Sequence, residues 1–316
     1  MRRVFAQRAS TVLYRLLLGR QDDRPWLLPA NICPIVPLVF LKAGVPMEWI
    51  DIDADSLCLD LRELLHRVDA HPTRYGGALF VHTYGRAQRL DGVIDSLHQI
   101  APDLTFVDDR CVCWPEFEPI NEQANVTLFS TGYAKPVDIG FGGYAFLRET
   151  VGYDDSDDAY DPKALESLTE QYKQRIAAGR PIRNADGDWL DHSTPTLDFD
   201  GYQTKVIEAT SAARHHQAAL REIYAAIPAS VRLPDGDWRT HLRLPERDAF
   251  VEKMFRSDLF CGTHYAPVSK IFGHADAPNA ERLHQDVVNL FDDRYYTQEQ
   301  AQRTVRLIEE HLNSCR

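Results

Sequence analysis

The sequence predicts an α/β protein with a large domain built on βαβ units, followed by a smaller C-terminal domain. Two strand–helix–strand patterns, at residues 26–53 and 78–107, support the large domain. A second alternation of strands and helices over residues 236–313 supports the small one. The chain of 316 residues is long enough for both, and we place the boundary between residues 1–204 and 205–316.

The composition excludes several classes of protein. A formal charge of −12 with no basic run argues against a nucleic-acid partner. The six cysteines show no zinc spacing, so we expect reduced thiols and no metal. No apolar run reaches the length of a membrane span, and the N-terminal MRRVFAQRAS lacks an apolar signal core. We therefore expect a cytoplasmic protein that binds no membrane.

The first candidate binding element is a helix over residues 8–18. Ser10 or Thr11 lies near its start, where free backbone N–H groups and hydroxyls suit a phosphate. An ordinary helix cap explains the same residues. The chain then continues through residues 26–53 as strand, helix and strand.

Two adjacent acids end the next βαβ unit. We expect a strand at 78–81, an amphipathic helix at 90–100 and a strand at 104–107, after which Asp108 and Asp109 follow. Ligands of open α/β sheets gather at the carboxyl ends of strands, so this pair is a candidate binding site.

The segment from 126 to 147 carries a lysine between two apolar runs of strand length. Lys135 is followed by the glycine cluster of GFGG (140–143), which lets backbone approach a ligand closely. Partial desolvation favours the neutral amine of such a lysine, which is a nucleophile. Taken alone, the segment favours a solvated turn lysine beside a glycine hairpin.

Together, these motifs resemble the DegT/DnrJ/EryC1/StrS aminotransferases. The matching pieces are VHTYG (81–85), DD (108–109), FSTGYAK (129–135) and GFGG (140–143). The resemblance implies the aspartate-aminotransferase type of fold (fold type I), with a mixed central sheet in the large domain and a small α+β C-terminal domain. It also implies pyridoxal 5′-phosphate (PLP) as cofactor.

The resemblance assigns roles to particular residues. Lys135 would bind PLP covalently and shuttle a proton, and Asp109, rather than Asp108, would keep the pyridine nitrogen protonated. Ser10 and Thr11, with the adjacent Ala9, and Ser130 would hold the phosphate. Gln203, in Gly-Tyr-Gln, would reach the phosphate of the partner subunit in a homodimer, although a solvated helix start at Tyr202 is equally compatible.

Two positions depart from the family pattern. Cys33 stands where an aromatic ring usually stacks on the pyridine, so another aromatic residue must be considered. Val112 stands where a Gln or His usually covers the ring, and valine cannot donate a hydrogen bond.

The resemblance implies an aminotransferase that moves an amino group, expected from glutamate, to a keto sugar, expected to be nucleotide-linked. Surface-polysaccharide or secondary-metabolite biosynthesis would be its pathway. The alternatives are a PLP-binding member with altered chemistry or a non-sugar acceptor, and a degenerate non-catalytic partner. A histidine in place of the lysine would indicate a dehydratase, which Lys135 argues against.

Overall fold

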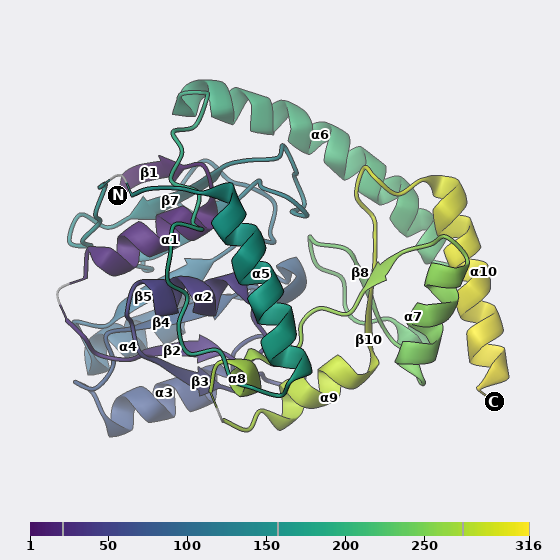
Figure 1. Ribbon diagram of the computed structural model, residues 1–316, viewed down its shortest axis with the longest axis horizontal. Helices are drawn as coiled ribbons and strands as arrows, with labels where there is room; N and C mark the ends of the chain where they lie inside the picture. The colour runs from purple at the N-terminus through teal and green to yellow at the C-terminus, as the bar shows by residue number, and fades with distance from the viewer. Residues whose placement is uncertain (21, 157, 274, 316) are drawn as a thin grey trace.

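A seven-stranded mixed sheet runs through the N-terminal half of the protein, of which the computed structural model describes residues 1–20, 22–156, 158–273 and 275–315 (Figure 1). The strand order is β1-β7-β6-β5-β4-β2-β3, and β7 runs antiparallel to both neighbours while the pairs from β6 to β3 are parallel. The strands are β1 (Arg2–Ala6), β2 (Trp26–Pro29), β3 (Met47–Ile50), β4 (Gly77–Val81), β5 (Thr105–Asp109), β6 (Val126–Ser130) and β7 (Gly143–Leu147). The predicted α/β class is confirmed.

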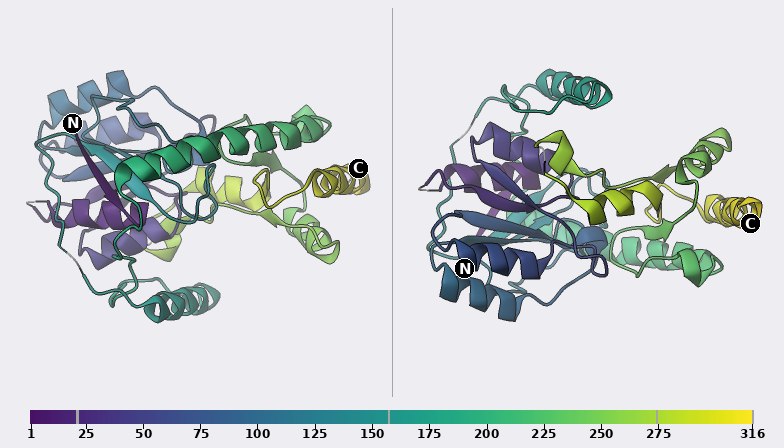
Figure 2. Two further views of the ribbon diagram at one scale, coloured as in Figure 1. Left: turned by 90° about the horizontal axis from the view of Figure 1, so that it is seen from above. Right: turned by 90° about the horizontal axis from the view of Figure 1, so that it is seen from below.

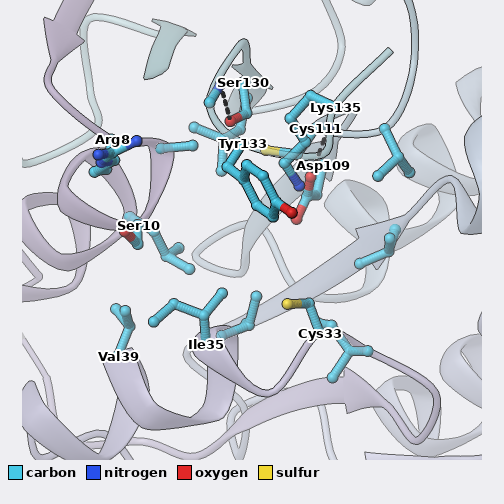
Figure 3. A pocket seen from close by; sticks show the side chains of 18 of the residues that line it. Arg8, Ser10, Cys33, Ile35, Val39, Asp109, Cys111, Ser130, Tyr133 and Lys135 are labelled. Carbon is cyan, nitrogen blue, oxygen red and sulfur yellow. Dashed lines mark hydrogen bonds between the residues drawn. The ribbon is translucent and has the colours of Figure 1, made fainter. Parts of the chain in front are cut away.

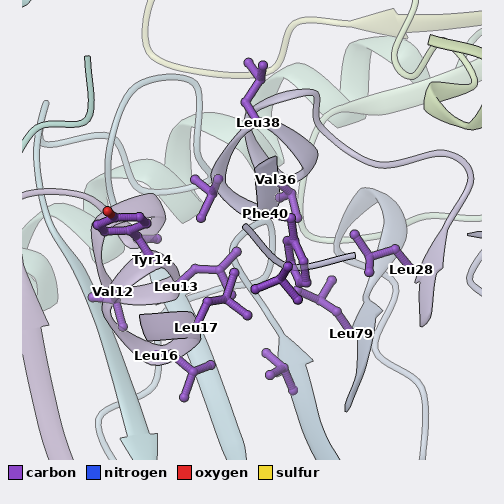
Figure 4. Packing of buried hydrophobic residues seen from close by; sticks show 14 of the residues in the cluster. Val12, Leu13, Tyr14, Leu16, Leu17, Leu28, Val36, Leu38, Phe40 and Leu79 are labelled. Carbon is purple, nitrogen blue, oxygen red and sulfur yellow. The ribbon is translucent and has the colours of Figure 1, made fainter. Parts of the chain in front are cut away.

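Helices cover both faces of this sheet because successive strand residues point to opposite sides. In β2, Leu28 packs with the α1–α2 side and Leu27 with the α3–α4 side. Figure 4 shows the first side, where Leu13 and Leu17 of α1 lie beside Phe40 of α2. These helices are α1 (Ala9–Leu18), α2 (Ile35–Lys42), α3 (Leu61–Ala70) and α4 (Asp91–Ile100), and a 3₁₀ turn, η1 (Thr83–Gly85), follows β4.

Two helices connect the two halves of the chain. The exposed helix α5 (Pro162–Ala177) stands away from the sheet in Figure 2. Helix α6 (Phe199–Tyr224) begins where the Asp198 side chain caps it by accepting from the Gly201 N–H at 2.9 Å. Its long axis runs from the sheet to the C-terminal half (Figure 1).

Within the described residues, the C-terminal half contains a three-stranded antiparallel sheet in the order β8-β10-β9. Its last helix begins with a capping box formed by Thr297 and Gln300. The elements are η2 (Ala229–Val231), β8 (Thr240–Arg243), α7 (Arg247–Arg256), β9 (Cys261–Gly262), α8 (Val268–Ile271), α9 (Pro278–Asp286), β10 (Val287–Leu290) and α10 (Gln298–Ser314). The predicted boundary at 204/205 falls inside α6, and the division into domains stays a prediction.

Helices in the described part of the chain are all too short or too polar to cross a membrane.

Candidate active site

A cavity of about 180 Å³ lies where β5 and β6 end, opposite the first turns of α1 and α2 (Figure 3). Three separate motifs of the sequence meet there, because the parallel strands bring their carboxyl ends to one edge of the sheet. The predicted site residues that line the cavity are Ser10, Asp109, Ser130 and Lys135.

Asp109 is a buried carboxylate that faces this cavity. Its side chain is 4% exposed, and its Oδ1 accepts from the Cys111 N–H at 2.9 Å. It forms no ion pair within the described part of the chain. Burial raises the pKa of Asp109 above its ordinary value, although the Cys111 hydrogen bonds and the charge of Lys135 oppose that shift. The carboxylate therefore has capacity for a further N–H donor.

Asp108 has the opposite surroundings. Its Oδ1 lies 2.6 Å from Nε2 of His82, and its Oδ2 accepts from Nε of Arg110 at 2.9 Å. Nδ1 of His82 lies 3.1 Å from the Gln88 N–H nitrogen and 3.3 Å from the Arg86 carbonyl oxygen. Burial alone would raise the pKa of Asp108, but the hydrogen bond and charge of His82, together with Arg110, lower it. Both oxygens are thus occupied away from the cavity.

Lys135 lies on the loop between β6 and β7, and that loop is fixed on both sides. The Asp138 carboxylate accepts from the N–H groups of Ala134 and Gly140, at 3.1 and 2.9 Å. Ala134 has a left-handed φ of 59°, and its carbonyl accepts from Nε1 of Trp238 at 2.7 Å. This backbone arrangement directs Lys135 to the cavity, where Figure 3 shows it beside Asp109 and Cys111.

The opposite end of the cavity offers donors for an anion. Ser10 lies in the first turn of α1, whose opening N–H groups have no acceptor within the helix. Ser130 ends β6 and is 7% exposed. A Cβ at Gly132 would lie 3.5 Å from Nη1 of Arg8 and 3.7 Å from Oγ of Ser130, so the glycine keeps the space between them open.

Arg8 was missed by the sequence reasoning. It lines the cavity immediately before α1, with its Nη1 donating to the Gly140 carbonyl at 2.7 Å and its Nε 3.4 Å from Asp191. A basic residue just before a small-residue helix start was the available signal. The hydrogen bond to Gly140 depends on the β6–β7 loop, which the sequence alone did not place.

Two predicted phosphate contacts do not reach the cavity. The hydroxyl of Thr11 donates to the Asp191 carbonyl at 2.7 Å, so Thr11 is a structural residue on the other side of α1. Gln203 lies on α6 outside the cavity, and its contact with a partner subunit stays a prediction. The solvated alternative for Tyr202 is wrong, because its ring is fully buried and its hydroxyl lies 2.7 Å from Oγ1 of Thr131.

The walls of the cavity are apolar. Cys33 and Val112 both line it, as the sequence register expected, and Val112 is 4% exposed. Two aromatic residues reach the cavity from elsewhere: Tyr133 on the lysine loop, 79% exposed, and the buried Tyr265 from the C-terminal half. Either ring supplies an aromatic surface that Cys33 lacks.

Comparison of the structure, and not of the sequence, finds similar proteins. No family model and no curated protein matches the chain. The sugar aminotransferase CalS13 from Micromonospora echinospora matches over 98% of this chain and 87% of its own (TM-score 0.67, 16% identity). A DegT DnrJ EryC1 StrS aminotransferase from Brucella abortus matches over 98% of this chain and 86% of its own, with a TM-score of 0.68 and 16% identity.

A third solved structure, the aminotransferase TlmJ from Streptoalloteichus hindustanus, matches over 99% of this chain and 86% of its own, with a TM-score of 0.72 and 15% identity. The protein therefore has the fold of the PLP-dependent aminotransferases of fold type I. The resemblance predicted from the motifs is confirmed for the fold.

Proposed function

We propose that this protein is a PLP-dependent aminotransferase acting on a keto sugar. The observation that carries the proposal is one cavity holding a lysine, a buried unpaired carboxylate and an anion-binding end. Solved structures of one Streptococcus pneumoniae protein with this fold are PLP and PMP forms, which supports the cofactor.

The residues fit the pyridine nitrogen, the phosphate and the aldehyde carbon of PLP. Asp109 is desolvated without an ion-pair partner in the described chain, so a protonated pyridine nitrogen would stabilise it. Ser130, Ser10, Arg8 and the opening N–H groups of α1 would hold the phosphate. PLP supplies an electron sink to the substrate carbon bonded to the amine.

The protein's own groups would move the proton. Lys135 would hold PLP covalently until the amino donor displaces it, and its free amine would then accept and return the donor's Cα proton. The loop bonds of Asp138 and Trp238 would keep that amine in position. The apolar walls would exclude water from the reacting carbon.

The acceptor would be a keto sugar, nucleotide-linked in this proposal, in surface-polysaccharide or secondary-metabolite biosynthesis. Solved structures with this fold include sugar aminotransferases, which supports the sugar. The active unit would be a homodimer in which Gln203 completes the partner's phosphate site.

The decisive experiment is the visible absorption spectrum of the protein with added PLP. We expect a band from lysine-bound PLP in wild type, its absence in Lys135→Ala, and its bleaching by glutamate. Lys205→Ala, on the exposed side of α6, is the matched control. Amino transfer should fall on the order of 10²–10⁴-fold in Lys135→Ala. Absence of any band in wild type would overturn the proposal.

A binding protein without turnover is the second candidate, favoured by Cys33 and Val112 on the cavity walls. It predicts a lysine-dependent band that no amino donor bleaches. The same spectra therefore decide between the two functions.

A further inference from the structure

A second cavity, of about 320 Å³, adjoins the first one, and Lys135 lines both. It lies between the lysine loop, α6 and the start of the C-terminal sheet. The structure places one buried guanidinium there, that of Arg239, on a wall that also includes Trp238. The position next to Lys135 makes this cavity a candidate for a substrate.

The guanidinium of Arg239 has two buried nitrogen atoms without a hydrogen-bonding partner within the described residues. The residue is 4% exposed, with Cζ 4.4 Å from the ring centre of Trp238 and 3.8 Å from that of Phe291. Its buried Nε and Nη1 have no acceptor there, and it forms no ion pair. Arginine stays charged in proteins, so a buried guanidinium without an anion is unstable relative to a paired one.

The neighbouring acid does not fill this role. Asp292, 3% exposed, accepts from Nε of Arg221 at 2.9 Å and from Nε2 of Gln217 at 3.3 Å. The backbone of Arg239 also has a left-handed φ of 55°, a conformation that residues other than glycine rarely adopt. Strained residues of this kind concentrate at ligand sites. The guanidinium is therefore held ready for an anion from outside the chain.

Charge and shape restrict that anion. Asp138 and Asp293 line the same cavity and would repel a doubly charged diphosphate. A zwitterion places one carboxylate on Arg239 and keeps its ammonium near the acids and Lys135. The short side chains of Ala209, Ala212 and Ala213 form an apolar wall that leaves room for a small aliphatic chain.

We propose that the second cavity binds the amino donor, an α-amino acid, with its carboxylate on Arg239. This assignment rests on the proposed function, because the donor's amine must reach the cavity that Lys135 and Asp109 share. It makes Arg239 a substrate-binding residue that selects carboxylates over phosphates.

Calorimetric titration of the protein without added PLP tests the assignment separately from the chemistry. The probes are L-glutamate, as an α-amino acid, and UDP, as a diphosphate. We expect L-glutamate to bind wild type, Arg239→Met to weaken its binding about tenfold or more, and Arg239→Lys to restore part of the affinity. Arg306→Met, exposed on α10, is the matched control and should change nothing.

A second pair of variants keeps the test valid if Arg239→Met fails to fold, which circular dichroism would reveal. Ala212→Leu fills the cavity from α6 and should weaken the binding of L-glutamate, whereas Ala218→Leu, exposed on the same helix and away from the cavity, should not.

Three outcomes would overturn the proposal: L-glutamate that does not bind wild type, an affinity for L-glutamate that neither Arg239→Met nor Ala212→Leu changes, or UDP binding that depends on Arg239. The last would assign the site to a phosphate group. Failure of the proposed function is seen separately, as the absence of the PLP band.

Discussion

The polar ends of the first cavity and its apolar walls are constructed differently. Asp109 and Ser130 stand at the carboxyl ends of adjacent strands, so the sheet fixes their positions. The side chains of Cys33 and Val112 pack among apolar neighbours at the edge of this sheet. The polar ends therefore specify which charged groups a ligand must carry. The wall residues that face the ring of a ligand can vary more freely.

The pair Asp108 and Asp109 gives the sharpest test of this difference, with effects of opposite sign. Asp108→Asn should lower the free energy of unfolding by about 3–5 kcal/mol, because it leaves Arg110 buried without a carboxylate. Asp109→Asn should raise the free energy of unfolding of the PLP-free protein at neutral pH, since it removes a buried unpaired charge.

The same pair separates stability from activity. Asp109→Asn should slow amino transfer on the order of 10²–10³-fold, which is the usual effect of removing one preorganised electrostatic group from an enzyme active site. Denaturant unfolding and steady-state rates measure both effects. A destabilised Asp109→Asn protein would show that this carboxylate is structural.

The pH dependence of unfolding follows from the same two groups. The folded-state pKa of Asp108 lies below its ordinary value of 3.8, so its stabilisation is present above that pH and is lost as the pH falls through the lowered pKa. The pKa of Asp109 is raised, so its contribution is present below 3.8 and is lost as the pH rises through the raised pKa. The stability advantage of Asp109→Asn should therefore vanish on acidification toward 3.8.

The anion-binding end predicts a change in affinity rather than stability. Ser130→Ala should weaken PLP binding about tenfold, because one hydrogen bond to a charged group is lost. Thr11→Val should leave that affinity unchanged and lower the free energy of unfolding by about 1 kcal/mol, through its lost bond to Asp191. Equilibrium titration of PLP into both variants checks this, and equal weakening would return Thr11 to the phosphate site.

The smallest expected effect lies on the walls. Cys33→Phe should tighten PLP binding by about 0.5–1.5 kcal/mol if the ring stacks on the pyridine. The same titration measures it, with Cys58→Ser, a buried cysteine outside the cavity, as a control for thiol loss. Unchanged affinity would indicate that Tyr133 or Tyr265 already provides the stacking surface.

The sequence predicted the strands and helices of the large half because their apolar periodicity and length are local properties. It also placed Asp109, Ser130 and Lys135 in one site, since strand ends converge in a parallel sheet. It misplaced Thr11 because both Ser10 and Thr11 fit a helix start, and only the contact with Asp191, 180 residues away, separates them. Arg239 escaped notice for the same reason: its isolation depends on which distant groups are already paired.

The hydrogen bond from Trp238 to the Ala134 carbonyl joins the C-terminal half to the residue directly before Lys135. Rotation of one half against the other would therefore pull on the lysine backbone as well as reshape the second cavity. Arg239 follows Trp238 in the chain, so a ligand that draws this guanidinium inward would also reposition the amine. The Ala134 carbonyl thus links the backbone beside Lys135 to the wall of the second cavity.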